Sequence, residues 1–440
     1  MKTIIVGAGP SGLFAAKELA DDFDVTVLER RDYVGGSGLH SDGKLNFHPL
    51  IGGDLTKFLS EKEAWDLVSY IREVFLSLGV EEREQDEAGM EDLKARAAKA
   101  GIRFIKIKQN HIGSDYLPEV MARMRRTLEE KGVDFLLGVE ATDLMVEGDR
   151  VTGVKTDDGL QSADNVILVP GRSGSRWLSS LMGRLGVQMH FNPIDISLRV
   201  EVPHEVVQEI INGYGVWDPK FHIYTPSYDD FVRTFCVCPR GFVVEDAYED
   251  GLIGVNGQSM RETGSPNTNF ALLTKMKLTH PLENTAEYGR RIAQLANTLG
   301  GKRPILQRLG DLRANRRSTW DRIERSYVEP TLENTTPGDI SMAYPSRIIR
   351  DFLEGLQMLD KVIPGVNSAS TLLYAPEIKF YAMRIETDRH LRTTISNLYV
   401  AGDGSGVSRG IIGAAATGII AAKGIINRDC PNLHLLLKSS

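Results

Sequence analysis

Three glycines and one acid near the N-terminus have the spacing of a nucleotide-phosphate site. Gly7, Gly9 and Gly12 follow an apolar, β-branched run at residues 3–6, and Glu29 ends the next such run, VTVLE. In such a turn, glycines allow a tight bend, close approach to a pyrophosphate, and helix–strand packing. Amides at the helix start would bind the anion, and Glu29 would accept hydrogen bonds from an adenosine ribose. The stretch therefore predicts a dinucleotide-binding βαβ unit.

A second strand–turn–helix signal lies close to the C-terminal end of the sequence. The run NLYVAGDGSG at 397–406 leads a strand into Gly402 and Asp403, and a small-residue helix is expected from about Ile411. A nicotinamide dinucleotide needs only the first unit, whereas FAD continues through a ribityl chain to its ring. We expect Asp403 to hold a ribityl hydroxyl and the following helix dipole to stabilise negative charge on the reduced flavin. The two motifs together predict FAD.

Size and composition set the class of protein. The chain has 440 residues, 42% hydrophobic and 25% charged, which suits a folded protein of about two or three domains. The net charge of −7 gives no general attraction to nucleic acid or acidic membranes. Three cysteines are too few for a disulfide scaffold, and no apolar run is long enough to span a bilayer. No basic leader precedes the first strand, so we expect a cytoplasmic protein.

The pattern along the chain predicts an α/β fold with an inserted domain. We expect helices at 60–79, capped by Ser60, and at 111–132, beginning near Ser114 or Asp115; 81–99 is helix-prone and 35–46 reads as an ordered loop. Short alternating runs over 133–170 predict a three-stranded antiparallel insert that returns to a parallel sheet. From about 196 the chain is β-prone, with helical stretches at 285–300 and 345–365. The expected domains are a discontinuous FAD-binding domain at 1–195 and 366–440, and an inserted β-rich α+β substrate domain at 196–365.

Several motifs together resemble a known superfamily. The opening motif, Gly35-Gly36, HIGSDYL at 111–117, VILVPGRSG at 166–174 and LYVAGDGSG at 398–406 are similar to those of the FAD-binding glutathione-reductase-like superfamily. More narrowly, the chain resembles a poorly characterised FAD-dependent dehydrogenase family with SDGKL, FCxCP and QRxxD motifs, here at 41–45, 235–239 and 307–311. The resemblance covers almost the whole chain. It implies a Rossmann-like FAD-binding domain but no established substrate.

The motifs and the resemblance give the expected FAD-binding residues. These are Gly7, Gly9, Pro10, Ser11, Gly12, Glu29, Arg30, Gly36, Ser37, Glu140, Ala141, Pro170, Gly171, Gly402, Asp403, Gly410 and Ile411. Two segments depart from the family pattern. Where the family has GYAGGI, residues 406–411 read GVSRGI, so the bulky cation Arg409 enters this segment. Where the family has ERTSSPVR, residues 377–384 read EIKFYAMR. The substrate pocket is therefore the least transferable part.

The candidate catalytic residues are Lys44, His48 and Ser41, in the loop expected to lie against the flavin ring. Lys44 would hydrogen-bond flavin N5 or O4, or else be a solvated surface lysine. His48 and His40 would transfer a proton near neutral pH, or else be polar packing residues. Ser41, with Asp42 and Asn46, is a hydrogen-bonding candidate. No His or Cys spacing typical of a zinc site is present.

Two further features allow alternatives. Cys236 and Cys238 lie in a predicted strand; we expect core packing and no disulfide between them, with a single redox-active thiol as the alternative. The segment 302–325 carries Lys302 and seven arginines against three acids. We expect a solvated or salt-bridged surface there, with an anion-binding groove as the alternative.

These features favour an FAD-dependent oxidoreductase that transfers a hydride between flavin N5 and a carbon of a small organic molecule. An anionic substrate is one option. No second Gly-x-Gly-x-x-Gly follows a strand, so NAD(P)H as a diffusible electron donor would dock without its own Rossmann domain. One alternative is a flavin monooxygenase or halogenase, although 403–413 lacks the proline-bearing loop of hydroxylases. Another is an FAD-stabilised binding protein that acts on a polyanion such as RNA; the acidic net charge argues against nucleic acid. The sequence names no substrate, electron acceptor or oligomeric state.

Overall fold

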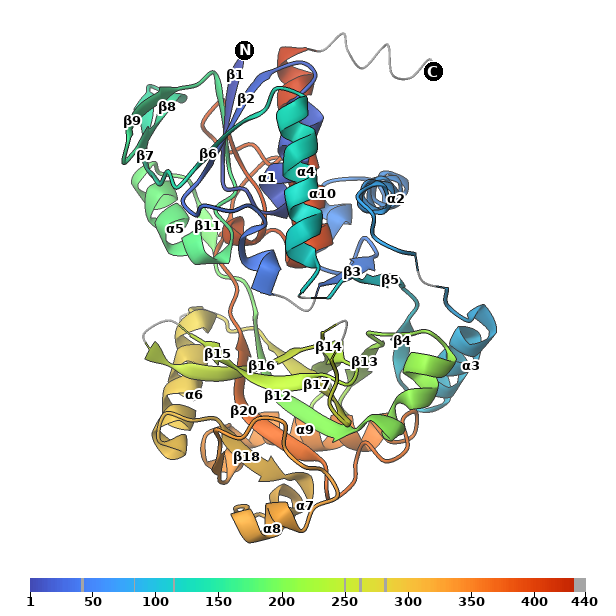
Figure 1. Ribbon diagram of the computed structural model, residues 1–440. Coiled ribbons are helices and arrows are strands. Elements are labelled where there is room, and N and C mark those ends of the chain that lie inside the picture. The colour runs from blue at the N-terminus through green and yellow to red at the C-terminus, as the bar shows by residue number, and fades with distance from the viewer. Residues whose placement is uncertain are drawn as a thin grey trace. The chain divides into compact units, whose positions relative to one another are not determined.

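The computed structural model describes residues 1–40, 43–82, 84–113, 115–248, 251–260, 263–280 and 283–430, without the side chains of Ser37 and His40. The chain divides into two compact units (Figure 1). The first unit contains Met1–Glu82, Asp115–Asn192 and Ala382–Ser440, and the second contains Arg83–Ser114 and Pro193–Tyr381. Each unit has its own sheet and core.

The first unit is built on a five-stranded parallel sheet. Its strands, in spatial order, are β22 (Leu398–Val400), β10 (Asn165–Leu168), β1 (Lys2–Val6), β2 (Asp24–Glu29) and β6 (Asp134–Leu137). All four strand pairs are parallel. The chain passes from β1 to β2 on one side and returns to β10 on the other, so the strand order reverses at β1. Ligands of open parallel sheets bind at the carboxyl ends of strands at such a reversal.

Helices cover one face of this sheet, and a small second sheet covers the other. Helix α1 (Pro10–Leu19) contacts α10 (Gly410–Asp429) and α4 (Leu117–Glu130). On the other face, side chains of β1, β10 and β22 pack with the antiparallel sheet β7 (Ala141–Glu147), β8 (Arg150–Thr156) and β9 (Gly159–Ser162), and with α5 (Ser175–Arg184). The remaining elements are β3 (Lys44–Phe47), α2 (Glu61–Ser77), β11 (Met189–His190) and β21 (Arg384–Ile385). The expected three-stranded insert is thus present.

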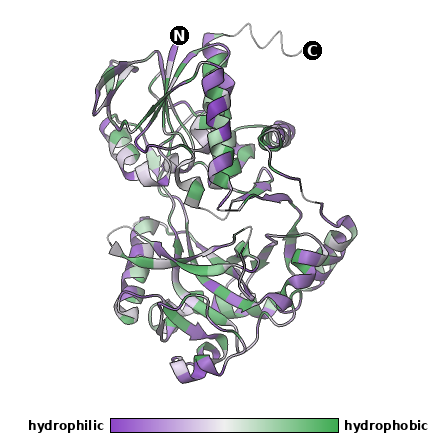
Figure 2. Cartoon of the chain, viewed as in Figure 1, coloured by the Kyte–Doolittle hydropathy of each residue, from purple (hydrophilic) through white to green (hydrophobic). Residues whose placement is uncertain are grey.

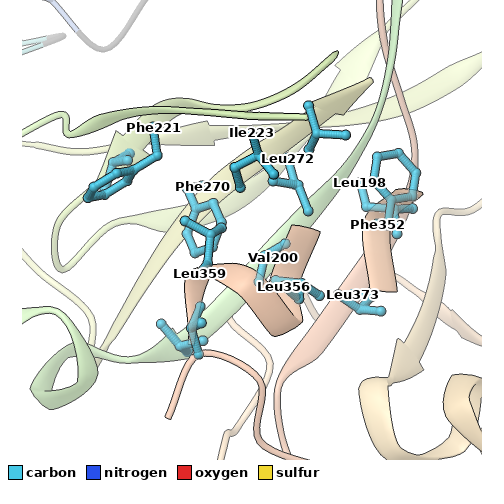
Figure 3. Packing of buried hydrophobic residues seen from close by; sticks show 14 of the residues in the cluster. Leu198, Val200, Phe221, Ile223, Phe270, Leu272, Phe352, Leu356, Leu359 and Leu373 are labelled. Atoms are coloured by element: carbon cyan, nitrogen blue, oxygen red, sulfur yellow. The ribbon is translucent and has the colours of Figure 1, made fainter. Parts of the chain in front are cut away.

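The second unit contains an eight-stranded mixed sheet. Its spatial order is β19 (Thr336–Pro337), β18 (Ile305–Arg308), β20 (Leu372–Lys379), β12 (Ile194–Pro203), β17 (Asn267–Met276), β14 (Phe231–Cys238), β13 (Lys220–Tyr224) and β4 (Arg103–Ile105). Helix α9 (Ser346–Leu359) contributes Phe352 and Leu356 to the buried cluster that also contains Leu198 and Val200 of β12 and Leu272 of β17 (Figure 3). The other elements are α3 (Glu87–Lys99), β5 (Lys108–His111), β15 (Phe242–Ala247), β16 (Ile253–Gln258), α6 (Thr285–Gly300), α7 (Leu309–Arg313) and α8 (Trp320–Glu324).

Most local expectations agree with the structure, and three differ. Ser60 caps α2 and exchanges hydrogen bonds with Glu63, as a capping box does. Residues 108–111 form β5, although His111 was expected in the helical segment 111–132, and α4 begins at Leu117, two residues after Asp115; Ser114 lies outside the described residues. Pro118 suits the first helical turn, where its missing N–H costs nothing. The expected loop at 35–46 contains a short 3₁₀ helix, Gly36–His40, and the start of β3.

The third difference concerns the division of the chain. Strand β20 pairs with β12 and β18, so residues 366–381, expected in the FAD-binding domain, belong to the second unit. Residues around α3 and β4, also expected in the first domain, join the second unit through the pairing of β4 with β13.

Among the described residues, α10 is the one helix long and apolar enough to cross a membrane, and 78% of its most apolar window is buried inside the structure. Figure 2 shows how hydrophobic residues alternate with hydrophilic ones along the elements; the hydrophilic side of α4 stands out. The burial of α10 against α1 is typical of a core helix.

Candidate functional site

The turn after β1 requires glycine at two positions and leaves open space at a third. Gly7 has φ +116°, and a Cβ there would lie 2.3 Å from the Val169 carbonyl oxygen. A Cβ on Gly12 would lie 1.9 Å from the Gly7 oxygen. Gly9 is different, since a Cβ there would meet nothing within 4 Å. The first and third glycines therefore allow backbone packing, and the open side of Gly9 fits a close ligand.

The start of α1 lies at this open position. Gly9 precedes the helix in an extended conformation, Pro10 occupies the first turn, and no side chain caps the helix. The Ser11 side chain is buried, and among the described residues its Oγ has no hydrogen-bond partner. Helix amides together with a buried hydroxyl are suitable donors for a phosphate. The sequence-predicted pyrophosphate position therefore fits the described geometry.

Glu29 lies at the end of β2, and its carboxylate bridges the neighbouring loops. Its Oε2 accepts a hydrogen bond from the Ala8 N–H (3.0 Å), and its Oε1 accepts one from the Arg31 N–H (3.1 Å). These bonds hold the carboxylate beside the glycine turn, and each oxygen has a further lone pair for a ribose hydroxyl. Arg30 and Glu140 lie close by, as an exposed ion pair of 3.8 Å.

The second predicted segment forms another turn at the start of a helix. Gly402 has φ +74°, and its N–H donates to Thr417 Oγ1 in α10 (3.0 Å). The Asp403 carboxylate accepts hydrogen bonds from Ser408 Oγ (3.1 Å) and the Gly410 N–H (3.3 Å). Burial raises the pKa of Asp403, while the Arg172 and Arg409 guanidiniums and these two bonds act against the rise. A carboxylate held in this way at the start of α10 can accept a hydrogen bond from a hydroxyl group of a ligand.

The two segments meet, although they are far apart in sequence. A Cβ on Gly402 would lie 3.2 Å from Ser11 Cβ, and one on Gly404 would lie 2.4 Å from the Gly171 oxygen. A Cβ on Gly36 would lie 3.4 Å from Gly9 Cα. The structure thus brings the turns after β1, β2, β10 and β22 together at the carboxyl edge of the parallel sheet.

The other predicted cofactor residues lie around these turns. Pro170 and Gly171 follow β10, Ile411 is buried in the first turn of α10, and Ala141 begins β7. A Cβ on Gly38 would lie 3.7 Å from Pro10 Cγ and 3.8 Å from Ile411 Cγ1, which places Pro10 and Ile411 near the same loop. The Glu140 side chain is exposed. The Ser37 side chain lies outside the described part of the chain.

The predicted catalytic residues are only partly described. Lys44 is half-buried at the start of β3. His48 Nδ1 accepts a hydrogen bond from the Leu50 N–H (3.1 Å), so a neutral ring carries its proton on Nε2, and the ring meets Trp65 edge-on at 4.9 Å. Ser41 and Asp42, and the side chain of His40, lie outside the described residues. The catalytic roles of Lys44, His48 and Ser41 stay predictions.

Sequence reasoning missed a group of buried charges in the second unit. Arg199 Nη1 lies 3.4 Å from Glu377 Oε1, and Lys379 Nζ lies 2.8 Å from the same oxygen. Arg233 Nη2 lies 2.6 Å from Asp195 Oδ2. The available signal was the charged residues within otherwise β-prone runs, ISLRVEVP and APEIK. Buried ion pairs are costly to form, so this group is a candidate for a role in binding or chemistry.

The arginine-rich segment forms β18, α7 and α8, and described ion pairs converge on Asp311. This buried carboxylate lies 2.8 Å from Arg316 Nε and 3.9 Å from Arg322 Nη1, and it accepts a hydrogen bond from Ser318 (2.9 Å). These contacts are those of a salt-bridged surface. Within the described ranges, no group of three or more His, Cys, Asp or Glu residues is arranged to hold a metal ion.

Two family models match the chain. Residues 5–44 match an NAD(P)-binding Rossmann-like domain, and residues 193–379 match the FAD-dependent protein, C-terminal domain-like family. The two matches cover the first nucleotide turn and most of the second unit. Together they support an FAD-dependent oxidoreductase with a Rossmann-like nucleotide-binding domain.

Two curated relatives share sequence with the chain. An uncharacterized protein of Clostridium beijerinckii is 27% identical, over 98% of this chain and 82% of its own length. A probable electron transfer flavoprotein-quinone oxidoreductase of Escherichia coli is 28% identical, but the match spans 48% of this chain and 44% of that protein. The second similarity is therefore to less than half of a flavoprotein.

Solved structures are similar only at a low level. An L-proline dehydrogenase from P. horikoshii has 12% identity and a TM-score of 0.45, covering 97% of this chain and 93% of its own. A glycine oxidase from Bacillus cereus has 13% identity and a TM-score of 0.40, covering 97% and 95%. At these scores the likenesses establish neither a common fold nor a common substrate.

Proposed function

We propose that the chain is an FAD-dependent dehydrogenase or reductase that moves a hydride between a carbon of a small organic molecule and the flavin. The observation that carries the proposal is the meeting of two nucleotide-binding turns, one at the start of α1 and one at the start of α10. When bound, FAD supplies N5 as the hydride acceptor or donor. This proposal is narrower than the family matches, which leave the reaction open.

The chain's own residues have separate roles in this proposal. The open side of Gly9 and the Ser11 hydroxyl bind the pyrophosphate, and Glu29 binds the adenosine ribose. Asp403 orients the ribityl chain. The positive end of the α10 dipole would favour negative charge on a flavin held at this turn. The protein thus contributes binding, orientation and electrostatics.

We propose that the second unit binds the substrate and that the substrate is anionic. Its central strands carry three cations, Arg199, Arg233 and Lys379, joined in ion pairs to two carboxylates, Glu377 and Asp195. Arg199 is fully buried and paired with Glu377, so the partly exposed Arg233 is the arginine that suits recognition of a substrate carboxylate or phosphate. NAD(P)H as the electron donor, and a cytoplasmic location, also stay proposals.

Anaerobic reduction of the purified protein tests the reaction class. We expect NADH, NADPH or a fraction of a metabolite pool enriched in organic acids to bleach the visible flavin absorbance. Dithionite serves as the control, because it reduces any accessible flavin. If dithionite bleaches the flavin and no metabolite or nicotinamide does, the dehydrogenase proposal is contradicted and a binding role is favoured. NAD(P)H oxidation that yields a hydroxylated product in air would instead indicate a monooxygenase.

A further inference from the structure

Strand β14 contains a bulge that brings two thiols together. Pairing with β17 shifts register between Phe235 and Cys238, and Cys236 has φ +49°, in the left-handed region. Neither cysteine is in a disulfide bond, and their Sγ atoms lie 3.9 Å apart. A disulfide needs ~2 Å between sulfur atoms, so the two thiols must approach further by side-chain rotation for the bond to form. A regular strand would point these two side chains to opposite faces, and the bulge, which the sequence does not reveal, instead brings their sulfur atoms together.

A buried arginine contacts this pair. Arg199 is fully buried, and its Nη2 donates to Cys238 Sγ (3.2 Å) and to the Cys236 carbonyl oxygen (2.9 Å). Asn269 Oδ1 accepts from the same guanidinium at 2.6 and 2.8 Å, which fixes its position. A Cβ on Gly257 would lie 1.6 Å from Nη2, so only glycine leaves room for the guanidinium there.

The charges around Arg199 favour an anion on sulfur. Burial alone would lower the pKa of Arg199. The opposite effect of Glu377 and of the sulfur atoms of Cys238 and Cys236 is larger, so the pKa is raised and the guanidinium stays charged. Glu377 is shared with Lys379, so two cations are paired with one carboxylate. An adjacent cation stabilises a thiolate, the form of cysteine that attacks disulfides.

The two thiols differ in access. Cys238 is fully buried, whereas Cys236 is half-buried. An outside molecule therefore reaches Cys236 first. Cys238, beside Arg199, lies within reach of the Cys236 sulfur. This asymmetry gives the pair an entry thiol and a resolving thiol.

We propose that Cys236 and Cys238 form a dithiol–disulfide couple that exchanges with a small-molecule disulfide of the glutathione type. The Cys236 thiolate attacks one sulfur of the disulfide, forming a mixed disulfide and releasing one thiolate. The Cys238 thiolate then attacks Cys236 Sγ, forming the internal disulfide and releasing the second thiolate. Two protein thiols are oxidised, one external disulfide is reduced to two thiols, and the two protons pass to the leaving thiolates through solvent. This activity goes beyond the proposed flavin reaction and needs no flavin.

The test is a redox titration of the intact wild-type protein. The reduced protein is equilibrated with mixtures of oxidised and reduced glutathione, denatured, alkylated with iodoacetamide and digested with trypsin. Peptide 234–240, TFCVCPR, contains both thiols, so its mass separates the dithiol, the mixed disulfide and the internal disulfide. We expect the unlabelled internal disulfide to accumulate as the ratio [GSH]²/[GSSG] falls. A peptide that keeps two labels at every ratio, or that carries glutathione instead, would overturn the proposal.

Two variants and a third cysteine test the assigned order. Cys238→Ser should accumulate a stable glutathione adduct on Cys236, whereas Cys236→Ser should form its adduct roughly tenfold or more slowly, because Cys238 is buried. Equal rates would overturn the assignment of entry and resolving thiols. Cys430, in the other unit, is an internal control and should form no internal disulfide. Circular dichroism of each variant checks the fold, and the wild-type titration stands without them.

Discussion

The carboxylate of Glu29, which we propose to bind the ribose, is held in place by the backbone around it. Both carboxylate oxygens accept backbone hydrogen bonds, one from Ala8 in the glycine turn and one from Arg31 in the next loop. The side chain therefore organises the turn and presents acceptor lone pairs at the same time. In the proposed site, the carboxylate is already oriented, so binding of the ribose would cost little further side-chain entropy.

We expect Glu29→Ala to weaken FAD binding by about 10- to 100-fold, because a hydrogen bond to a charged group contributes about 1.5–3 kcal/mol. Titration of the apoprotein with FAD, followed by quenching of flavin fluorescence, measures the change. Asp22→Ala is the control, because this exposed acid lies in the turn before β2. Equal affinity of wild type and Glu29→Ala would remove Glu29 from the site.

Residues differ in how well their roles can be predicted. Gly7, Gly12 and Glu29 could be placed because their constraints are local to one βαβ unit. Cys236 could not, because its left-handed conformation depends on how β14 pairs with β17. Nor could Arg199, whose partners come from β14, β17 and β20.

Helices α1 and α10 pack against each other, and this contact positions both of the proposed nucleotide-binding turns. A Cβ on Gly418 of α10 would lie 2.0 Å from the Ser11 oxygen, and one on Gly413 would lie 2.0 Å from the Gly52 oxygen. Gly418 lets α10 approach α1 at backbone contact, and Gly413 lets it approach the loop that contains Gly52. The contact fixes the start of α1, and Ser11 with it, against Gly402. The small residues of α10 thus serve the site as well as the core.

We expect Gly418→Ala to lower the free energy of unfolding by about 1–3 kcal/mol, because the added methyl group overpacks the helix contact. It should also reduce the amount of FAD that copurifies. Thermal unfolding and the flavin-to-protein absorbance ratio measure the two effects. Gly183→Ala in α5 is the matched control, since its Cβ would make only an ordinary 3.7 Å contact with Met189. A Gly418→Ala protein with the stability and flavin content of this control would contradict the role given to the helix contact.

Elements with strong local signals were predicted well. The N-cap at Ser60, the insert of β7, β8 and β9, and the helical stretches that form α6 and α9 were all expected from local sequence patterns. Strand β5 was not expected, because 108–111 lacks a clear strand pattern. Short strands depend on their partners more than on their own residues.

At the scale of the whole molecule, the chain leaves the first unit and returns to it twice. The sequence predicted one long insertion, because the change to β-prone texture near 196 is visible. It did not predict that α3 and β4 join the second unit, since the partner of β4 is β13, far along the chain. The first unit is therefore assembled from three segments, of which the first and last carry the two nucleotide turns.

We propose that the first and last segments of the first unit bind the same FAD molecule. The most direct measurement is the identity and amount of nucleotide released when the purified protein is denatured, by chromatography and mass spectrometry. The account predicts FAD at close to one molecule per chain once the protein is saturated, with both Glu29→Ala and Asp403→Ala proteins retaining less after dialysis. A saturated protein that releases no flavin, or that binds a nicotinamide dinucleotide in its place, would contradict it.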